Sequence, residues 1–214
     1  MVALDGVQDK CTLFCFIKYQ TVMKKLLTTL LCAMLTLGAF AQSEHLTFKG
    51  VPIDGSLDEF VDKMRDVGFR YLGTQDGIAI LTGDFAGFKG CTIGVNTLEA
   101  LDIVSMIGVI FPEEDDWGSL AGTYENLKSM LTQKYGRYSE CVEEFQGYTE
   151  PKDDNMRLIK LKMDNCVWYT IYSTDKGDIE LSLDHNGTNS CFVLLRYFDK
   201  INTQSVQQRA LEDL

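Results

Sequence analysis

Short segments in which apolar and polar residues alternate, separated by turn signals, fill most of residues 69–111 and 138–199. In the segment 178–184, for example, every second residue is apolar, which is typical of a strand with one buried and one solvated face. The pairs Asp76-Gly77 and Asn186-Gly187 are typical of tight hairpin turns. Strands that follow one another through short turns pair antiparallel, so this feature restricts the chain to folds built on antiparallel sheets.

Each run of strands follows a predicted helix. Ser56 and Glu59 form a capping box, and Gly68 is typical of the residue that ends a helix. A second helix is predicted from Trp117 to about Tyr135, and a short polar helix from about 203 to 211. The second helix has a predicted buried stripe, formed by Leu120, Tyr124, Leu127 and Leu131.

We therefore expect an α+β fold of two helix-plus-four-strand antiparallel units, with the helices packed on one face of the sheet or sheets. The units are predicted at 45–112 and 113–200, and a short helix or tail at 201–214. The strands are predicted at 69–72, 78–81, 91–96, 103–111, 138–146, 156–173, 178–184 and 191–199.

Residues 23–41 have the three parts of a secretory signal peptide. Met23-Lys24-Lys25 precedes an apolar run, and Ala39-Phe40-Ala41 is typical of a cleavage site. Because the apolar run is short for a membrane span, we expect a signal rather than an internal anchor, which is the alternative. We then expect translation to start at Met23, residues 1–22 to be a start-site artefact, and the mature protein to be periplasmic or extracellular, in the bacterial envelope or outside it.

The charge of the chain argues against nucleic acid as a partner. The formal net charge is −11, and the segment 1–41 holds four lysines and two aspartates, which leaves −13 from Gln42 onward. Nucleic-acid binding depends largely on neutralising phosphates with Lys and Arg. We also expect no stable membrane span after signal cleavage, and we expect no cofactor.

Four cysteines follow the predicted cleavage site, and their number is even. In an exported protein, this favours disulfides, although the sequence leaves all three pairings open. The alternative is that these cysteines are buried apolar residues. They are Cys91, Cys141, Cys166 and Cys191.

Two groups of residues are candidates for chemistry. Cys191 follows His185 closely, and Asp184 could orient the imidazole of a Cys-His nucleophile, but this histidine lies in a predicted hairpin turn, where histidine is usually a solvated turn residue. The acidic run Glu113-Glu114-Asp115-Asp116 could bind calcium, but it lacks the spacing of a calcium loop and is also typical of a helix N-terminus. We therefore expect no metal.

Aromatic residues gather in the last strands. Trp168 and Tyr172 share one strand face, so they are candidates for a binding patch if that face is exposed, and core residues if a helix covers it.

The order of helix and strands resembles the beta-lactamase-inhibitor-protein fold and the SmpA-type outer-membrane assembly lipoproteins. This resemblance implies tandem helix-plus-four-strand units and carries over no site residue. The segment from His45 to Gly55 also resembles segments of uncharacterised exported proteins of gut anaerobic bacteria. This resemblance implies no known activity. We expect an exported, non-enzymatic binding or envelope protein that contacts a protein or envelope component through a sheet surface. The alternative is a small secreted hydrolase that uses Asp and Glu side chains or the Cys-His pair.

Overall fold

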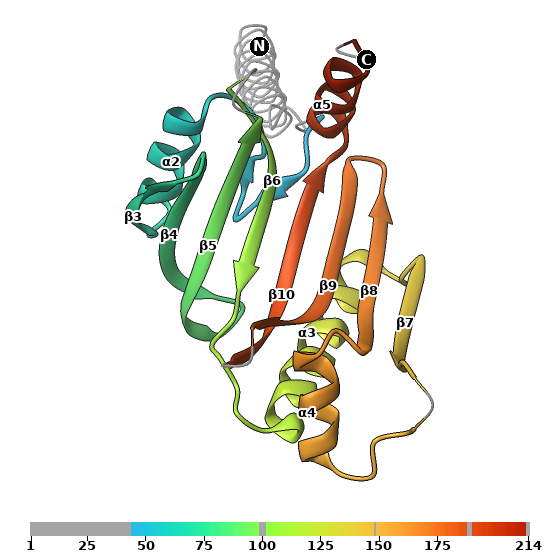
Figure 1. Ribbon diagram of the computed structural model, residues 1–214. Helices are drawn as coiled ribbons and strands as arrows, with labels where there is room; N and C mark the ends of the chain where they lie inside the picture. Colours follow the sequence, from blue (N-terminus) through green and yellow to red (C-terminus); the bar gives the residue numbers. More distant parts are fainter. Residues whose placement is uncertain (1–43, 99–101, 148, 188–189, 213–214) are drawn as a thin grey trace, which may run out of the picture. The chain divides into compact units, whose positions relative to one another are not determined.

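Eight strands form one sheet, in which every neighbouring pair is antiparallel (Figure 1). The computed structural model describes residues 44–98, 102–147, 149–187 and 190–212. They belong to one unit, Ser43–Leu214. The predicted signal peptide at 23–41 and the segment 1–22 lie outside the described residues.

The spatial order of the strands is β3-β4-β5-β6-β10-β9-β8-β7. Strands of the two predicted units therefore join at the centre of the sheet, where β6 pairs with β10. A separate hairpin of β1 (Thr47–Phe48) and β2 (Val51–Pro52) precedes the sheet. The strands of the sheet are β3 (Arg70–Gln75), β4 (Ile78–Phe85), β5 (Phe88–Leu98), β6 (Ile103–Ile110), β7 (Glu140–Phe145), β8 (Cys166–Thr174), β9 (Gly177–Asn186) and β10 (Ser190–Asp199).

The predicted turn between β3 and β4 is confirmed. Asp76 and Gly77 both have positive φ angles, of 51° and 76°. A two-residue hairpin turn needs this conformation at both positions because its twist matches that of the strands. The local sequence thus sets the turn of the β3–β4 hairpin.

The helices begin at residues whose side chains cap them. Ser56 accepts a hydrogen bond from the backbone N–H of Glu59 at the start of α2 (Leu57–Asp66), as the capping box predicts. Asp116 caps α3 (Trp117–Tyr135) in the same way. The chain described by the structure ends in α5 (Lys200–Glu212), which continues directly from β10.

One strand prediction is wrong in part. The segment expected as a strand from 156 to 173 begins with a helix, α4 (Asp154–Lys162), and only Cys166 onward is strand β8. Asp153 caps this helix, and Leu158 and Leu161 bury its inner side. The alternation of apolar residues in this segment fits a helix of two turns as well as a strand, so only packing decides between them.

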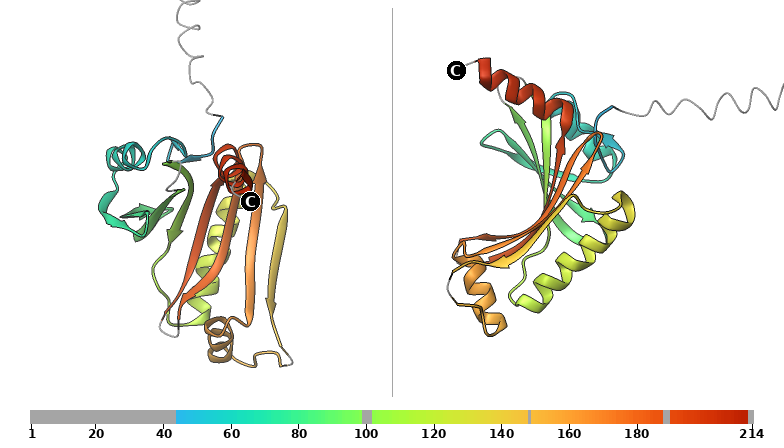
Figure 2. Two further views of the ribbon diagram at one scale, coloured as in Figure 1. Left: turned by 45° about the horizontal axis from the view of Figure 1, so that its top comes forward. Right: turned by 90° about the vertical axis from the view of Figure 1, so that its right-hand side faces the viewer.

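The helices α2, α3 and α4 and the β1–β2 hairpin pack against one face of the sheet, and the right-hand view of Figure 2 shows α3 along it. The predicted stripe of α3 is confirmed, because its four members are at most 5% exposed. Phe60 and Met64 of α2 are fully buried, and Phe48 of the hairpin contacts Tyr197 edge to face at 5.4 Å. The core therefore lies on this side of the sheet, which we call the covered face.

Candidate binding face

The other face of the sheet carries the side chains that alternate with the core residues, and we call it the open face. The helix α5 continues from the end of β10, where it contacts β6, β9 and β10, and it extends away from the sheet (Figure 2). Strand register places one row of side chains across seven strands of the open face. From β4 to β7 the row reads Ile80, Gly94, Gly108, Arg196, Glu180, Ile171 and Glu140.

Large apolar side chains dominate the central part of the open face, where Asn96 and Thr92 of β5 lie between those of β4 and those of β6. The solvated face of an antiparallel sheet is usually polar, but six positions on β4, β6 and β10 hold large apolar side chains that are only half-buried. Partly accessible apolar groups gathered on one surface are typical of interaction sites. They are Ile78, Ile80, Met106, Ile110, Leu194 and Phe198.

Two glycines form a low point at the centre of this apolar area. Gly94 and Gly108 face each other across β5 and β6. A Cβ atom at Gly94 would lie 3.5 Å from Ile78, and one at Gly108 would lie 3.8 Å from Leu194, both ordinary contact distances. Since neither crowding nor backbone conformation requires glycine here, the pair leaves space in which another molecule can approach the sheet closely.

The other part of the open face, on β7 to β9, is acidic. Arg196 pairs with Glu180 at 2.9 Å and with Asp184 at 3.5 Å. Glu140 accepts a hydrogen bond from Tyr169, and this bond raises the pKa of the tyrosine. Together with Asp178 and Glu144, the carboxylates outnumber the single arginine, so the potential over this part is negative.

A buried hydroxyl lies between these two parts. Ser182 of β9 is opposite Tyr169 of β8 and Leu194 of β10. Its residue is 7% exposed, and its Oγ atom has no hydrogen-bond partner among the described residues. A buried polar atom normally has a partner, so this hydroxyl is a free donor and acceptor beneath the open face.

The candidate binding residues Trp168 and Tyr172 lie on the covered face instead. Tyr172 is 1% exposed, and its hydroxyl lies 2.9 Å from both the hydroxyl of Thr132 and the carbonyl oxygen of Lys128 on α3. Trp168 packs edge to face on Trp117 at 5.3 Å. Tyr172 is therefore a core residue, and Trp168 is half-buried against the core. Helices cover the face that these two residues share, which is the second of the two alternatives that the sequence left open.

The candidate catalytic residues do not assemble. Cys191 and His185 are cross-strand neighbours, but the imidazole contacts the Gly187 carbonyl at 2.7 Å and the Asp164 carboxylate at 3.0 Å. Asp184 lies on the open face, where it pairs with Arg196. Burial raises the pKa of the Cys191 thiol, whereas a nucleophilic cysteine needs a lowered one.

Two residues of the acidic run at 113–116 form hydrogen bonds with backbone groups. Asp116 caps α3 by accepting from the N–H of Ser119 at 2.8 Å. Hydrogen bonding with the side chain of Ser119, and then with its backbone, lowers the pKa of the Asp116 carboxyl. Glu114 forms a bridge with Cys191 through backbone atoms. In the part of the chain that the structure describes, no group of three or more His, Cys, Asp or Glu side chains is arranged to hold a metal ion.

The four candidate disulfide cysteines have free thiols and lie on different strands: β5, β7, β8 and β10. Cys166 and Cys191 are separated by β9, so their backbones are about 9.5 Å apart at the usual strand spacing. A disulfide needs a Cα separation below about 7 Å. Burial raises the pKa of Cys166 to about 12, with the nearby Cys191 adding to the effect. Pairing of these cysteines stays a prediction of the sequence.

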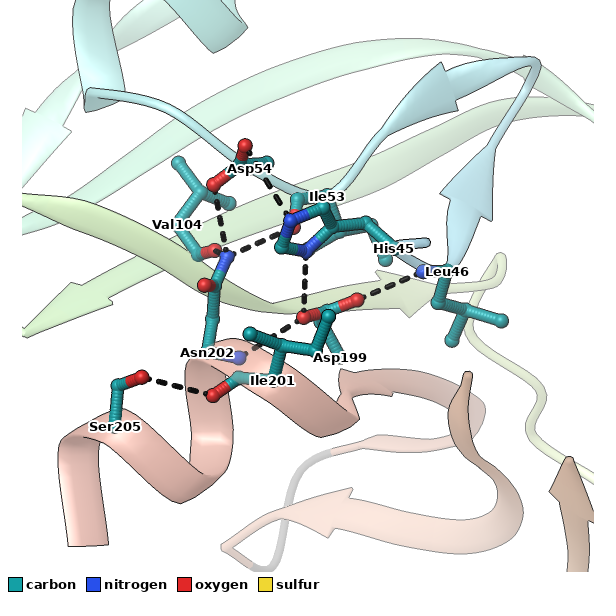
Figure 3. Close-up of polar contacts among 9 residues, drawn as sticks. All are labelled: His45, Leu46, Ile53, Asp54, Val104, Asp199, Ile201, Asn202 and Ser205. Carbon is teal, nitrogen blue, oxygen red and sulfur yellow. Dashed lines mark hydrogen bonds and ion pairs between the residues drawn. The ribbon is translucent and has the colours of Figure 1, made fainter. Parts of the chain in front are cut away.

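A buried polar network that sequence reasoning missed joins the two ends of the described chain (Figure 3). Asp199 is fully buried and accepts hydrogen bonds from the N–H of Leu46 at 2.7 Å and of Asn202 at 3.0 Å. The ring nitrogens of His45 lie 2.9 Å from Asp199 and 3.5 Å from Asp54. This network holds α5 and the first strands together, and no sequence signal marks partners that are 154 positions apart.

Comparisons of the chain with models of known families, with curated proteins and with solved structures returned no match. None of the described helices is long and apolar enough to cross a membrane. We therefore infer a function from the geometry of the open face.

Proposed function

We propose that this protein is an exported, non-enzymatic binding protein that holds a partner against the open face of its sheet. The observation that carries the proposal is the apolar area on β4, β6 and β10, with the Gly94–Gly108 low point at its centre. Burying such side chains in a complex is favourable by about 25 cal/mol for each Å² removed from water.

The two parts of the open face favour a partner with matching chemistry. An apolar surface that places a side chain over the glycine pair would fill the low point. Basic groups beside it would face the carboxylates on β7 to β9, which steers association and fixes orientation.

We also infer that the sheet consists of two helix-plus-four-strand units. In support, α2 precedes β3 to β6 and α3 precedes β7 to β10, and each run of four strands lies in sequence order from one sheet edge to the centre. The helix α4, between β7 and β8, departs from the repeat. Such units are what the resemblance to the beta-lactamase-inhibitor-protein fold implies.

We infer export from the signal-peptide pattern at 23–41. An exported protein would have its open face in the periplasm or outside the cell, and we propose a protein or another envelope component as the partner there.

The test compares two glycine substitutions in quantitative affinity capture from the native cell envelope. Gly108→Gln fills the low point of the open face, while Gly122→Gln adds the same side chain on an exposed turn of α3, where a Cβ meets nothing within 4 Å. We expect the native protein and Gly122→Gln to capture the same partners in similar amounts. With Gly108→Gln, we expect the captured amount of these partners to fall at least tenfold. Equal retention by both variants, each melting like the native protein, would refute binding at the open face.

A further inference from the structure

A small apolar hollow lies on the covered side of the sheet, where α3 and the turn between β4 and β5 both meet β10. Its volume is about 190 Å³. The strand β10 contributes Leu195 and Tyr197 to its lining, and α3 contributes Leu127 and Leu131. All four side chains are at most 5% exposed, so they belong to the core and give the hollow apolar walls.

The end of β4 and the turn after it line the hollow through Phe85 and Ala86. The ring of Phe85 stacks on Phe48 at 5.0 Å and lies 6.2 Å from the ring of Phe111. These contacts hold Phe85 in place whether or not the hollow is filled. A molecule that enters would therefore meet a preformed site and would not have to order its walls.

A single charged residue lines the hollow. This residue is Lys134 of α3, which is exposed, and no described Asp or Glu shares the lining. Its ammonium group lies 4.7 Å from the centre of the Tyr135 ring and forms no ion pair with a described residue. Lys134 also borders a neighbouring hollow, in which the charges of Lys176 and Asp175 offset each other. The apolar hollow thus has a positive edge, in a chain whose net charge is −11.

We propose that this hollow binds a free short-chain alkyl carboxylate of about the size of octanoate. The alkyl chain would lie against the apolar walls, out of water, and the carboxylate would lie beside Lys134. An ammonium group with no carboxylate near it favours an anion over a cation with the same chain. The volume is below the about 300–1,000 Å³ of sites for drug-sized ligands, which restricts the ligand to a short chain.

This site goes beyond the binding of a partner at the open face. The two surfaces lie on opposite sides of the sheet and share no lining residue. Binding of a carboxylate is measured with the purified protein alone, whereas the open face is tested by capture of partners. The two proposals can therefore fail separately.

The test uses the full chain labelled at its methionine methyl groups and titrated with sodium octanoate in the NMR spectrometer. Met130 lines the hollow and is 42% exposed, so its methyl signal reports on this site. We expect that signal to shift and saturate, while the signals of Met156 and Met163, at and just after α4, stay in place. Octylammonium has the same chain with the opposite charge, and butyrate has the same charge with a shorter chain. Each should bind at least tenfold more weakly than octanoate.

Reversing one charge completes the design. Lys134→Glu should weaken octanoate binding at least tenfold and strengthen the binding of octylammonium, with Met130 still present as the reporter. The control is Lys152→Glu, which reverses another exposed lysine, outside the hollow, and should bind octanoate within twofold of the native protein. The proposal is overturned if octanoate does not saturate the Met130 signal, if it shifts Met156 and Met163 as strongly, if octylammonium binds the native protein equally well, or if Lys134→Glu keeps the native affinity for octanoate.

Discussion

Replacing Asp199 with asparagine tests whether the buried network in Figure 3 stabilises the fold. The carboxylate of Asp199 is surrounded by donors: the N–H of Leu46 reaches one oxygen, and the N–H of Asn202 reaches the other. Asparagine has the same shape but only one acceptor oxygen. Whichever way the amide turns, its NH2 group faces a buried N–H, and that donor is left without an acceptor.

The size of the effect follows from these contacts. A hydrogen bond to a charged group contributes about 1.5–3 kcal/mol, and a buried donor left unsatisfied costs about 1–3 kcal/mol. Because these two quantities overlap, we expect Asp199→Asn to lower the free energy of unfolding by about 2–4 kcal/mol. That is a large share of the about 5–15 kcal/mol that a domain commonly has.

The assay is urea unfolding at pH 7, followed by the fluorescence of the core residues Trp117 and Trp168. The matched control is Asp178→Asn, because Asp178 is exposed on the neighbouring strand β9. Its effect should stay within about 0.5 kcal/mol, as for most surface substitutions. If Asp199→Asn also stays within about 0.5 kcal/mol of the native protein, the network does not stabilise the fold as we reason.

Three further predictions concern other contacts. Gly177→Ala should lower the free energy of unfolding by about 3 kcal/mol or more, measured by urea unfolding, because the new Cβ would lie 2.0 Å from a backbone oxygen of β10 at a φ of +151°; a loss below 1 kcal/mol would contradict this. Tyr124→Phe removes the 2.6 Å hydrogen bond to Thr170 and should cost about 1–2 kcal/mol in the same assay, with no loss expected if that bond contributes nothing. The hydrogen bond with Asp164 raises the pKa of His185 above its ordinary value of 6.5, so its contribution to stability should be present below pH 6.5 and be lost as the pH rises through the folded-state pKa. NMR titration should show that Asp164→Asn lowers this pKa, and an unchanged pKa would contradict the assignment.

Local features of the fold were predictable from short stretches of sequence. Ser56 and Glu59 mark the start of α2 because a cap needs only neighbouring residues, and Asp76-Gly77 marks a turn because its φ angles suit those residues. The cap of α4 at Asp153 is equally local, yet the alternation in the segment after it predicts a strand. Its apolar residues fit both periods, so the local signal was ambiguous.

The candidate site could be predicted only in outline. Alternation places Trp168 and Tyr172 on one side of their strand, but it does not say which side the helices cover. The structure places α3 over that side, and the open face is therefore formed by residues such as Ile80, Gly108 and Leu194. Sequence reasoning gave these three no role, since a half-buried apolar residue or a strand glycine has no distinctive local pattern.

The sequence by itself determined the α+β class, the antiparallel pairing of consecutive strands and the ends of the first two helices. These features depend on contacts between residues close in the chain, where propensity and periodicity act directly. Only the tertiary structure decided that β6 pairs with β10 and that the Asp199 carboxylate accepts from the N–H of Leu46. Such contacts join residues far apart in the chain, and their energy comes from burial and hydrogen bonding that no short stretch of sequence contains.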